Sequence, residues 1–437
     1  MTPIQPKRVP VLEGSEGGAL TLDAPSALDL LLAKGRLRAR LAMLGPAFVA
    51  AIAYVDPGNF ATNISGGAAY GYLLLWVVLA ANLIAMLVQY LSAKLGIASD
   101  RDLPENVRAH YPRAVAWGMW LQAELIAMAT DIAEFLGAAL GLNLLFGVPL
   151  LPAGLITGLI AFALLGLQAL GFRRFELAIS ALLGIIFAGF AYEVLRIGPS
   201  VHGSLRGLIP SLDGKSSLYL AVGIIGATVM PHVIYLHSAL TRGRVPVRDE
   251  EERRRVLRFE RSDVIIALGF AGLINMAMLA VAAKLFHTPA LSGLDSIQAA
   301  HAQLGNLVGG GAALAFAVAL LASGASSSSV GTYAGQVVMS GFLNVRVPVL
   351  VRRAVTMIPA LVVLAVGMNP TSALVLSQVV LSFGIPFALV PLVLLTSRAD
   401  VMGAHVNRTL TRYAAWACTL GIVALNVFLL YQQLLGG

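Results

Sequence analysis

Long runs of apolar residues, separated by short polar segments, dominate the chain and predict a bundle of membrane-spanning helices. A helix needs about 20 mainly apolar residues to cross the roughly 30 Å hydrocarbon core of a bilayer. The fold class is therefore predicted to be all-α, a polytopic membrane protein with eleven transmembrane helices. The predicted spans lie near 46–70, 72–94, 114–146, 150–171, 175–196, 217–240, 263–286, 305–340, 353–368, 371–396 and 412–434.

Composition supports the membrane assignment. Of the 437 residues, 58% are hydrophobic and only 12% are charged, whereas a typical soluble domain has roughly 25% charged residues. So few charges cannot cover the surface of two or three globular domains, which argues against a soluble enzyme. The single cysteine, Cys418, excludes disulfides within the chain and any cysteine-based metal site.

The distribution of basic residues predicts the orientation. Loops on the cytoplasmic side of a membrane protein are enriched in Lys and Arg. With a cytoplasmic N-terminus, 26 of the 30 Lys and Arg residues fall on the cytoplasmic side, and eleven spans place the C-terminus outside. The net charge of +8 is thereby explained by topology, and we expect no nucleic-acid partner.

Two of the predicted spans contain a proline at a polar motif. The first is interrupted by DPGN at 56–59 and the sixth by MPH at 230–232. Proline lacks a backbone donor and clashes with the carbonyl of residue i−4, so these prolines free the carbonyls of Ala53 and Ala227. Such orphan carbonyls are tolerated at membrane depth only where protein buries them or where they line a cavity.

The positions of the two breaks predict an internal repeat. Spans 1 and 6 correspond if the chain has two five-helix repeats, and an odd number of spans inverts the second copy. We predict a cytoplasmic tail at 1–41, repeats at 42–200 and 201–400, and an added eleventh span with the C-terminus at 401–437. Paired interrupted helices are typical of the substrate site of a transporter.

The side chains at the breaks favour a metal cation. Asp56 is either the N-cap of the second half-helix or a ligand, because a carboxylate at the bilayer centre is costly and usually functional. Asn59 adds an amide oxygen, and Met230 a thioether. Methionine is often only core filler, yet soft sulfur beside oxygen ligands favours transition-metal dications over Mg²⁺ and Ca²⁺.

The stretch AYVDPGN at 53–59, together with MPH at 230–232, resembles the paired signatures of the Nramp family. That family moves divalent metals in symport with protons and has the LeuT-like architecture of five plus five inverted helices. The resemblance covers the whole chain. It implies metal binding by Asp56, Asn59, Met230 and the Ala227 carbonyl, with the Ala53 carbonyl joining in some conformations. Gln378 is a further contributor or an interhelical hydrogen-bonding residue.

Span 3 carries three acids that suit a proton pathway. At 100° per residue, Glu124, Asp131 and Glu134 lie on one side of the helix. Three acids on one face need water, protons or cations opposite them. For Asp131 and Glu134 a functional role is favoured, whereas Glu124, nearest the cytoplasm, is either a relay member or a salt-bridged residue at the membrane interface.

Two histidines follow the second break, and histidine titrates near neutral pH. The predicted relay runs from Asp56 to His232 and Glu134, then to Asp131. His237 is a weaker candidate, because it would equally well bond a backbone carbonyl. Arginines near the cytoplasmic ends would supply counter-charges for the acids of span 3: Arg244, Arg352 and Arg353.

These observations predict proton-coupled import of Mn²⁺, Fe²⁺ and similar dications such as Co²⁺ and Cd²⁺ by a monomer in a bacterial plasma membrane. The metal and protons would be cargo, with no resident cofactor and no enzymatic activity. The main alternative is a LeuT-like amino-acid carrier coupled to Na⁺ or H⁺. A zinc hydrolase using His232 and His237 is disfavoured by their i, i+5 spacing, and a channel by the dissimilar ligands.

Overall fold

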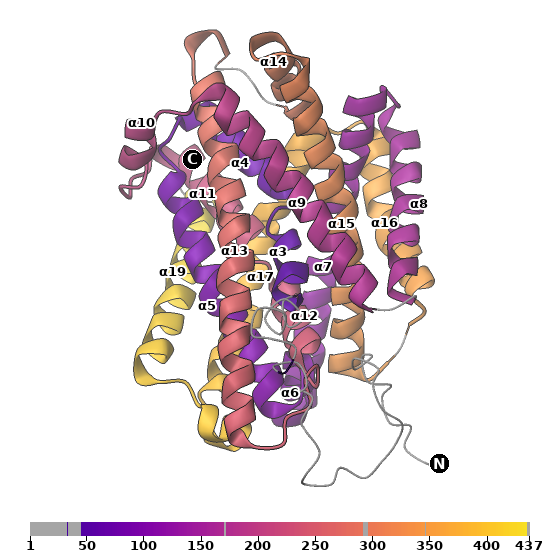
Figure 1. Ribbon diagram of the computed structural model, residues 1–437, viewed down its shortest axis with the longest axis vertical. Helices are drawn as coiled ribbons and strands as arrows, with labels where there is room; N and C mark the ends of the chain where they lie inside the picture. The colour runs from indigo at the N-terminus through magenta and orange to yellow at the C-terminus, as the bar shows by residue number, and fades with distance from the viewer. Residues whose placement is uncertain (1–32, 34–44, 170–171, 292–295, 346, 435–437) are drawn as a thin grey trace.

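A computed structural model describes residues 33, 45–169, 172–291, 296–345 and 347–434. Nearly all of the predicted tail at 1–41 lies outside the described residues. Throughout the described part of the chain, regular secondary structure is entirely helical, as the apolar pattern predicts. The helices pack side by side into one elongated bundle (Figure 1).

Within the described residues, eight helical segments are long and apolar enough to cross a membrane. They are α5 (Leu75–Ser99), α7 (Arg113–Phe146), α9 (Phe172–Ile197), α11 (Gly214–Thr228) with α12 (Pro231–Thr241), α13 (Glu250–Phe286), α15 (Gly310–Leu343), α17 (Pro370–Thr396) and α19 (Thr409–Leu434). The other three predicted spans correspond to α3 (Pro46–Ala53) with α4 (Pro57–Tyr70), to α8 (Leu150–Ala169) and to α16 (Val349–Val366). The count of eleven crossings therefore stays a prediction.

Two predicted spans differ in extent from the helices observed. The segment 305–340 is not one helix, because α14 (Ile297–Leu307) ends before Gly309, whose φ of 117° breaks the helix ahead of α15. The span at 263–286 is the second part of α13, which begins at Glu250. Asp249 caps that early start by accepting from the backbone N–H groups of Glu251 and Glu252, both at 2.8 Å.

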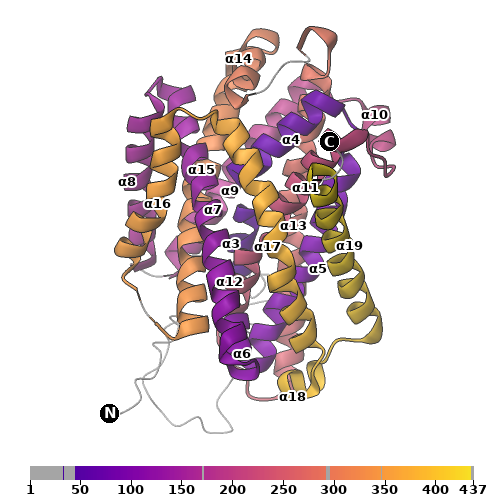
Figure 2. The same cartoon turned by 180° about the vertical axis from the view of Figure 1, so that it is seen from behind.

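Short helices mark the two ends of the bundle (Figures 1 and 2). At one end lie α6 (Leu103–His110) and α18 (Ala399–Met402), which the 3₁₀ turn η2 (Gly403–His405) follows. At the other end lie α10 (Val201–Arg206) and α14, which comes after the 3₁₀ turn η1 (Pro289–Leu291). The connections thus alternate between ends, as successive membrane crossings require.

The broken helices occupy the interior. In the most apolar stretch of α11 with α12, 94% of the residues are buried, against 28% for α9 and for α19. Large apolar side chains are exposed on the peripheral helices, among them Leu159, Leu195, Val366 and Leu420. An apolar exterior of this extent is expected for a surface in contact with lipid.

Small residues let the helices around the first break approach closely. A Cβ at Gly137 of α7 would overlap the ring of Pro57. A Cβ at Gly324 of α15 would lie 2.5 Å from the backbone nitrogen of Ala138 in α7. Glycines at interhelical contacts are typical of membrane bundles, where van der Waals packing drives association. The start of α4 is thereby fixed against a frame made of α7 and α15.

Candidate substrate site at the paired helix breaks

Residues 54–56 separate α3 from α4, and neighbouring helices satisfy the backbone there. Asn275 Nδ2 of α13 donates to the carbonyl of Tyr54 at 2.7 Å. Ser323 Oγ of α15 donates to the carbonyl of Val55 at 2.6 Å. Protein groups rather than lipid therefore accommodate the unwound backbone, as membrane depth requires. Ala53 closes α3 and is fully buried.

Asp56 is the N-cap of α4, and its two carboxylate oxygens differ sharply. Oδ1 accepts from the backbone N–H and from Nδ2 of Asn59, both at 2.8 Å. Oδ2 is buried and has no hydrogen-bond partner among the described residues. A buried anionic oxygen without a partner is costly. One oxygen therefore serves the helix, and the other is left for a positively charged ligand or a proton.

The second break meets the first through Asn59. Its Nδ2 donates to the Ala227 carbonyl at 2.9 Å as well as to Asp56, and Thr228 Oγ1 donates to Asn59 Oδ1 at 3.4 Å. The N–H groups of this amide thus lie between two oxygens that converge on one centre. Met230 follows closely, as the fully buried N-cap residue of α12.

Helix α17 places Gln378 against both breaks. A Cβ at Gly58 would overlap the side-chain amide of Gln378, and a Cβ at Gly226 would overlap its backbone carbonyl. Gln378 is fully buried, its Nε2 donates to Ser377 Oγ at 3.2 Å, and its Oε1 has no partner among the described residues. Only glycines at these two positions admit α17, so Gln378 lies where either sequence interpretation would place it.

The acids of α7 are engaged in different ways. Glu124 Oε2 accepts from Arg352 Nη2 at 2.9 Å, and Asp131 Oδ1 accepts from Arg353 Nη1 at 2.8 Å. Both arginines come from α16 and are buried. Glu134 is fully buried with no hydrogen-bond partner for either oxygen in the described part of the chain. Its carboxylate interacts electrostatically with Asp131, Arg353 and Asp56.

His232 lies near these groups but bonds to a residue that the sequence did not indicate. Its Nδ1 is 3.3 Å from Thr130 Oγ1 of α7, and its Nε2 is buried without a partner among the described residues. Thr130 directly precedes Asp131 in the sequence, so the break of α12 and the acid-bearing face of α7 are in contact. The structure thus brings His232 of α12 against the acid-bearing helix α7, and the relay from Asp56 to Asp131 stays a prediction.

His237 belongs to a separate polar chain. Its Nδ1 is 2.9 Å from Gln89 Oε1, its Nε2 is 3.0 Å from Glu260 Oε1, and Gln89 Nε2 donates to Tyr54 Oη at 2.5 Å. Sequence reasoning missed Gln89 and Glu260 as its partners. Glu260 lies in the charged first part of α13, where a solvated side chain would be expected, yet it is almost entirely buried.

The prediction for Arg244 is wrong. It pairs with both carboxylate oxygens of Glu176 on α9, at 2.5 and 3.2 Å, rather than with the acids of α7. Arg352 and Arg353 already occupy two of those acids, and Arg244 comes after α12, where α9 supplies the nearer carboxylate. A second missed group lies close by: Asp263 Oδ2 accepts from the backbone N–H of Ala47 at 3.1 Å.

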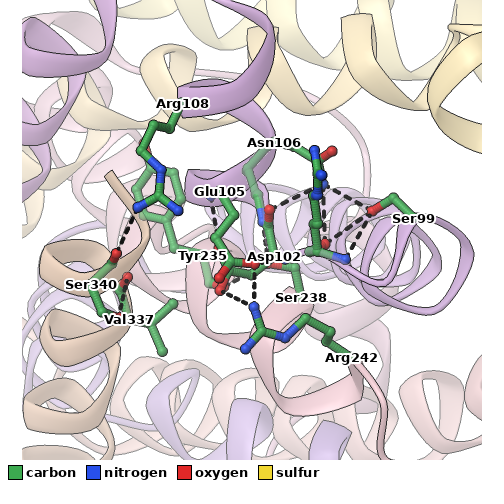
Figure 3. Close-up of polar contacts among 12 residues, drawn as sticks. Ser99, Asp102, Glu105, Asn106, Arg108, Tyr235, Ser238, Arg242, Val337 and Ser340 are labelled. Atoms are coloured by element: carbon green, nitrogen blue, oxygen red, sulfur yellow. Dashed lines mark hydrogen bonds and ion pairs between the residues drawn. The ribbon is translucent and has the colours of Figure 1, made fainter. Parts of the chain in front are cut away.

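Residues at the start of α6 contact the C-terminal end of α12 through a polar cluster (Figure 3). Arg242 lies against the carboxylates of Asp102, at 3.3 Å, and Glu105. Ser238 Oγ accepts from the backbone N–H of Leu103 at 2.9 Å. Burial, with the nearby Glu105 carboxylate, raises the pKa of Asp102 to about 7. No sequence pattern pointed to this cluster, because its members come from separate polar loops.

The donor set does not resemble a hydrolytic metal centre. Within the described ranges, no group of three or more His, Cys, Asp and Glu side chains is placed to hold a metal ion. His232 and His237 bond to different partners on different helices. The arrangement at the breaks instead combines a carboxylate, amides and a backbone carbonyl, with all of the predicted ligand residues fully buried.

Comparisons of sequence place this chain among metal-cation transporters. Residues 47–432 match the family described as Nramp, natural resistance-associated macrophage protein-like. The chain is 55% identical over 401 residues to the divalent metal cation transporter MntH of Deinococcus radiodurans, covering 92% of each protein. It is 51% identical over 394 residues to the MntH protein of Bacillus subtilis, covering 90% of this chain and 92% of that relative.

Comparisons of structure agree. The manganese transporter of Eremococcus coleocola, crystallised with an aromatic bis-isothiourea substituted compound, superposes with a TM-score of 0.82 at 35% identity. The match covers 90% of this chain and 87% of that one. Mhp1, a nucleobase-cation-symport-1 family transporter, has a TM-score of 0.54 at 16% identity, covering 90% and 88%. This second likeness shows the fold alone, and together they confirm the predicted LeuT-like fold class.

Proposed function

The chain belongs to the Nramp family, and from this premise we propose that it imports divalent transition-metal cations, chiefly Mn²⁺ and Fe²⁺, by alternating access. Nramp proteins are transporters, so the chain is not an enzyme. The similar proteins described above, two divalent metal cation transporters and a manganese transporter, support the choice of cargo. Co²⁺ and Cd²⁺ are further expected substrates, because the proposed ligands include sulfur.

The observation that carries the proposal is the unpartnered Oδ2 of Asp56 beside two converging oxygens. Asp56 Oδ1 and the Ala227 carbonyl both accept from the amide of Asn59. A cation entering here would replace these N–H groups, and rotation of the amide would present its oxygen. Met230 would add its thioether, Ala53 its carbonyl in some conformations, and Gln378 its unpartnered Oε1.

An amino-acid substrate is less compatible with this site. A carrier that binds a carboxylate through a helix N-terminus uses the free N–H groups and the positive end of the helix dipole. Here the first turn of α4 begins at a proline, and the N–H of Asn59 is already taken by Asp56. The carboxylate of Asp56 would also repel an anionic group, so the electrostatics of the break favour a cation.

Uptake by purified protein in liposomes tests the assignment. Wild-type protein should accumulate radiolabelled Mn²⁺, whereas Asp56→Ala should lose nearly all uptake because both capping and ligation depend on this carboxylate. Asp213→Ala is a matched control, because Asp213 is also a helix N-cap but is exposed and makes no side-chain cap bond. Uptake of a labelled amino acid in place of Mn²⁺ would sink the proposal.

Proton coupling is the second part of the proposal. It is supported by the contact of the His232 ring with Thr130 and by the electrostatic interaction of Glu134 with both Asp56 and Asp131. Glu134 would hold the proton that leaves Asp56 when metal binds, and Asp131 with Arg353 would pass it on. A pH-sensitive dye inside the liposomes should report acidification during Mn²⁺ uptake, and Glu134→Gln should abolish it. Uptake without acidification in wild type would exclude symport.

We further propose eleven membrane crossings in a bacterial plasma membrane, with the N-terminus cytoplasmic and a monomer as the working unit. The bias of Lys and Arg toward one side and the alternation of short helices at the two ends support this topology. The chain's repeats at 42–200 and 201–400 would then have opposite orientations. The end that carries α6 and α18 would be cytoplasmic.

A further inference from the structure

A buried carboxylate on α9 belongs to neither the proposed metal site nor the proposed proton pathway. Glu193 is 1% exposed, and neither of its oxygens has a hydrogen-bond partner among the described residues. An ionised carboxylate in an apolar environment without a partner is strongly disfavoured. The side chain must therefore be neutral or must meet a proton or cation in some state of the transport cycle.

Its position follows from an aromatic contact directly beside the substrate site. Phe60, the residue after Asn59, packs edge-on against Phe190 of α9, with ring centroids 5.3 Å apart, and against Phe316 of α15 at 5.7 Å. Glu193 follows Phe190 by three residues. It therefore lies roughly 4.5 Å further along α9, on nearly the same helix face.

Along α9, Glu193 lies closer than Phe190 to the end of the bundle that carries α10. Helices α4 and α9 both finish there, since the backbone N–H of Ser200, shortly after α9, donates to Tyr72 Oη, shortly after α4, at 2.9 Å. In the proposed topology this end is outside the cell. The three phenylalanine rings thus separate Glu193 from Asp56, with Glu193 on the outward side.

Asn63 places a second unsatisfied oxygen at the same level. It follows Phe60 by three residues on α4, just as Glu193 follows Phe190 on α9. Its Nδ2 donates to Asn275 Oδ1 at 3.0 Å, but its own Oδ1 is buried and has no partner in the described part of the chain. Helices α4 and α9, which meet at the Phe60–Phe190 ring contact, therefore each carry acceptor oxygens that lack a donor one turn beyond it.

We propose that Glu193 and Asn63 form an outer cation site, which holds a divalent cation before the aromatic rings separate and admit it to Asp56. This inference rests on the proposed function. Carboxylate and amide oxygens are hard ligands that bind Mn²⁺ but also Ca²⁺ and Mg²⁺. The outer site therefore concentrates dications with little discrimination, and selection is left to the inner site.

Calorimetric titration of purified protein with Mn²⁺ tests the site directly. Asp56→Ala removes the inner site and should retain a weaker binding event. Adding Glu193→Gln to that variant should abolish the remaining heat, because the amide keeps the size of the side chain but loses its charge. If the single and double variants bind Mn²⁺ equally, Glu193 is not a ligand and the inference fails.

Transport kinetics separate a ligand from a packing residue. In otherwise wild-type protein, Glu193→Gln should raise the KM for Mn²⁺ about tenfold, as loss of one interaction at a metal site commonly does, and leave the maximal rate unchanged. Glu193→Asp keeps the charge and should stay near wild type. Tyr192→Phe, on the neighbouring and exposed position, is the control and should change neither parameter.

The outcomes distinguish this inference from the proposed function. Equal KM values for wild type and Glu193→Gln, with uptake still dependent on Asp56, would overturn the outer site alone. Equal increases for the Gln and Asp variants would also overturn it, because packing would then explain both. Uptake that does not depend on Asp56 would overturn the proposed function itself. Melting temperatures of all variants confirm that the proteins compared are folded.

Discussion

Asp56 caps α4 with one oxygen and leaves the other for the proposed metal, which would explain why a charged residue occupies a position where Ser or Thr would also cap a helix. Oδ1 holds the first turn of α4 through both N–H donors of Asn59. Oδ2 stays without a partner in the described structure. A Ser or Thr hydroxyl would cap the helix but is neutral and offers no second, anionic oxygen to a cation. The cap and ligand interpretations of the sequence are therefore compatible.

Met230 is the residue on which metal selectivity is expected to depend. It is fully buried at the N-cap of α12 and makes no side-chain cap bond, so its thioether is not needed to start the helix. Removing the sulfur should narrow the preference for Mn²⁺ or Cd²⁺ over Ca²⁺ by about tenfold, or ~1.4 kcal/mol of differential binding. Competition of Ca²⁺ with Mn²⁺ uptake in Met230→Ala measures this.

A matched substitution controls for the loss of volume. Met402 of α18 is also buried, and Met402→Ala creates a similar cavity at the end of the bundle, away from the paired breaks (Figure 2). That variant should lose stability, since such truncations cost about 2–5 kcal/mol, but keep its selectivity. If Met230→Ala discriminates against Ca²⁺ as well as wild type does, the thioether is not a selectivity ligand.

At the scale of helices, the sequence was informative wherever a local chemical rule operates. Proline at 57 and at 231 predicted both breaks, because it cannot donate to the preceding turn. The predicted span boundaries were wrong where hydropathy was averaged over residues in different environments. Hydropathy predicts one span at 305–340, whereas Gly309 separates α14 from α15, and the charged run before 263 is the beginning of α13.

Asp102 at the start of α6 should make the stability of the folded protein depend on pH. Burial raises the pKa of Asp102 from 3.8 to about 7, so the folded chain favours the protonated carboxyl more than the unfolded chain does. Between these values the folded state binds more protons, and its stability therefore falls as pH rises through this window. Asp102→Asn has no carboxyl to ionise and should lose this contribution to the pH dependence.

Thermal unfolding of purified protein tests this at about pH 5 and about pH 8, on either side of most of the titration. The decrease in melting temperature between the two conditions should be smaller for Asp102→Asn than for wild type. Asp213→Asn, on an exposed carboxyl, should behave as wild type does. Equal decreases for Asp102→Asn and wild type would show that ionisation of Asp102 does not contribute to the pH dependence of stability.

At the scale of the whole molecule, partners from distant helices were the part that sequence reasoning could not supply. Helical periodicity placed Glu124, Asp131 and Glu134 on one face of α7, but it did not assign Arg352 to one acid and Arg353 to another. The hydrogen-bonded series Tyr54–Gln89–His237–Glu260 joins the first break to three helices, α5, α12 and α13, that are far apart in sequence. Such contacts depend on how the bundle packs, which residue spacing does not encode.

The number of crossings is the remaining global prediction, and the single cysteine makes it testable. Cys418→Ala yields a chain without cysteine, into which one cysteine can be placed at an exposed position: Lys215 before α11, Glu251 at the start of α13, or Tyr431 in the last turn of α19. One crossing separates Lys215 from Glu251. An odd total, with a cytoplasmic N-terminus, puts Tyr431 on the side of Lys215.

A membrane-impermeant maleimide applied to intact bacterial cells should therefore label Lys215→Cys and Tyr431→Cys, and should reach Glu251→Cys only after permeabilisation. The positive-inside distribution requires this result, because reversing the chain would put 26 of the 30 basic residues outside. Protection of Tyr431→Cys together with Glu251→Cys would mean an even number of crossings. Because a two-repeat bundle without the last helix has an even number, that result would remove α19 from the membrane while leaving the paired breaks in place.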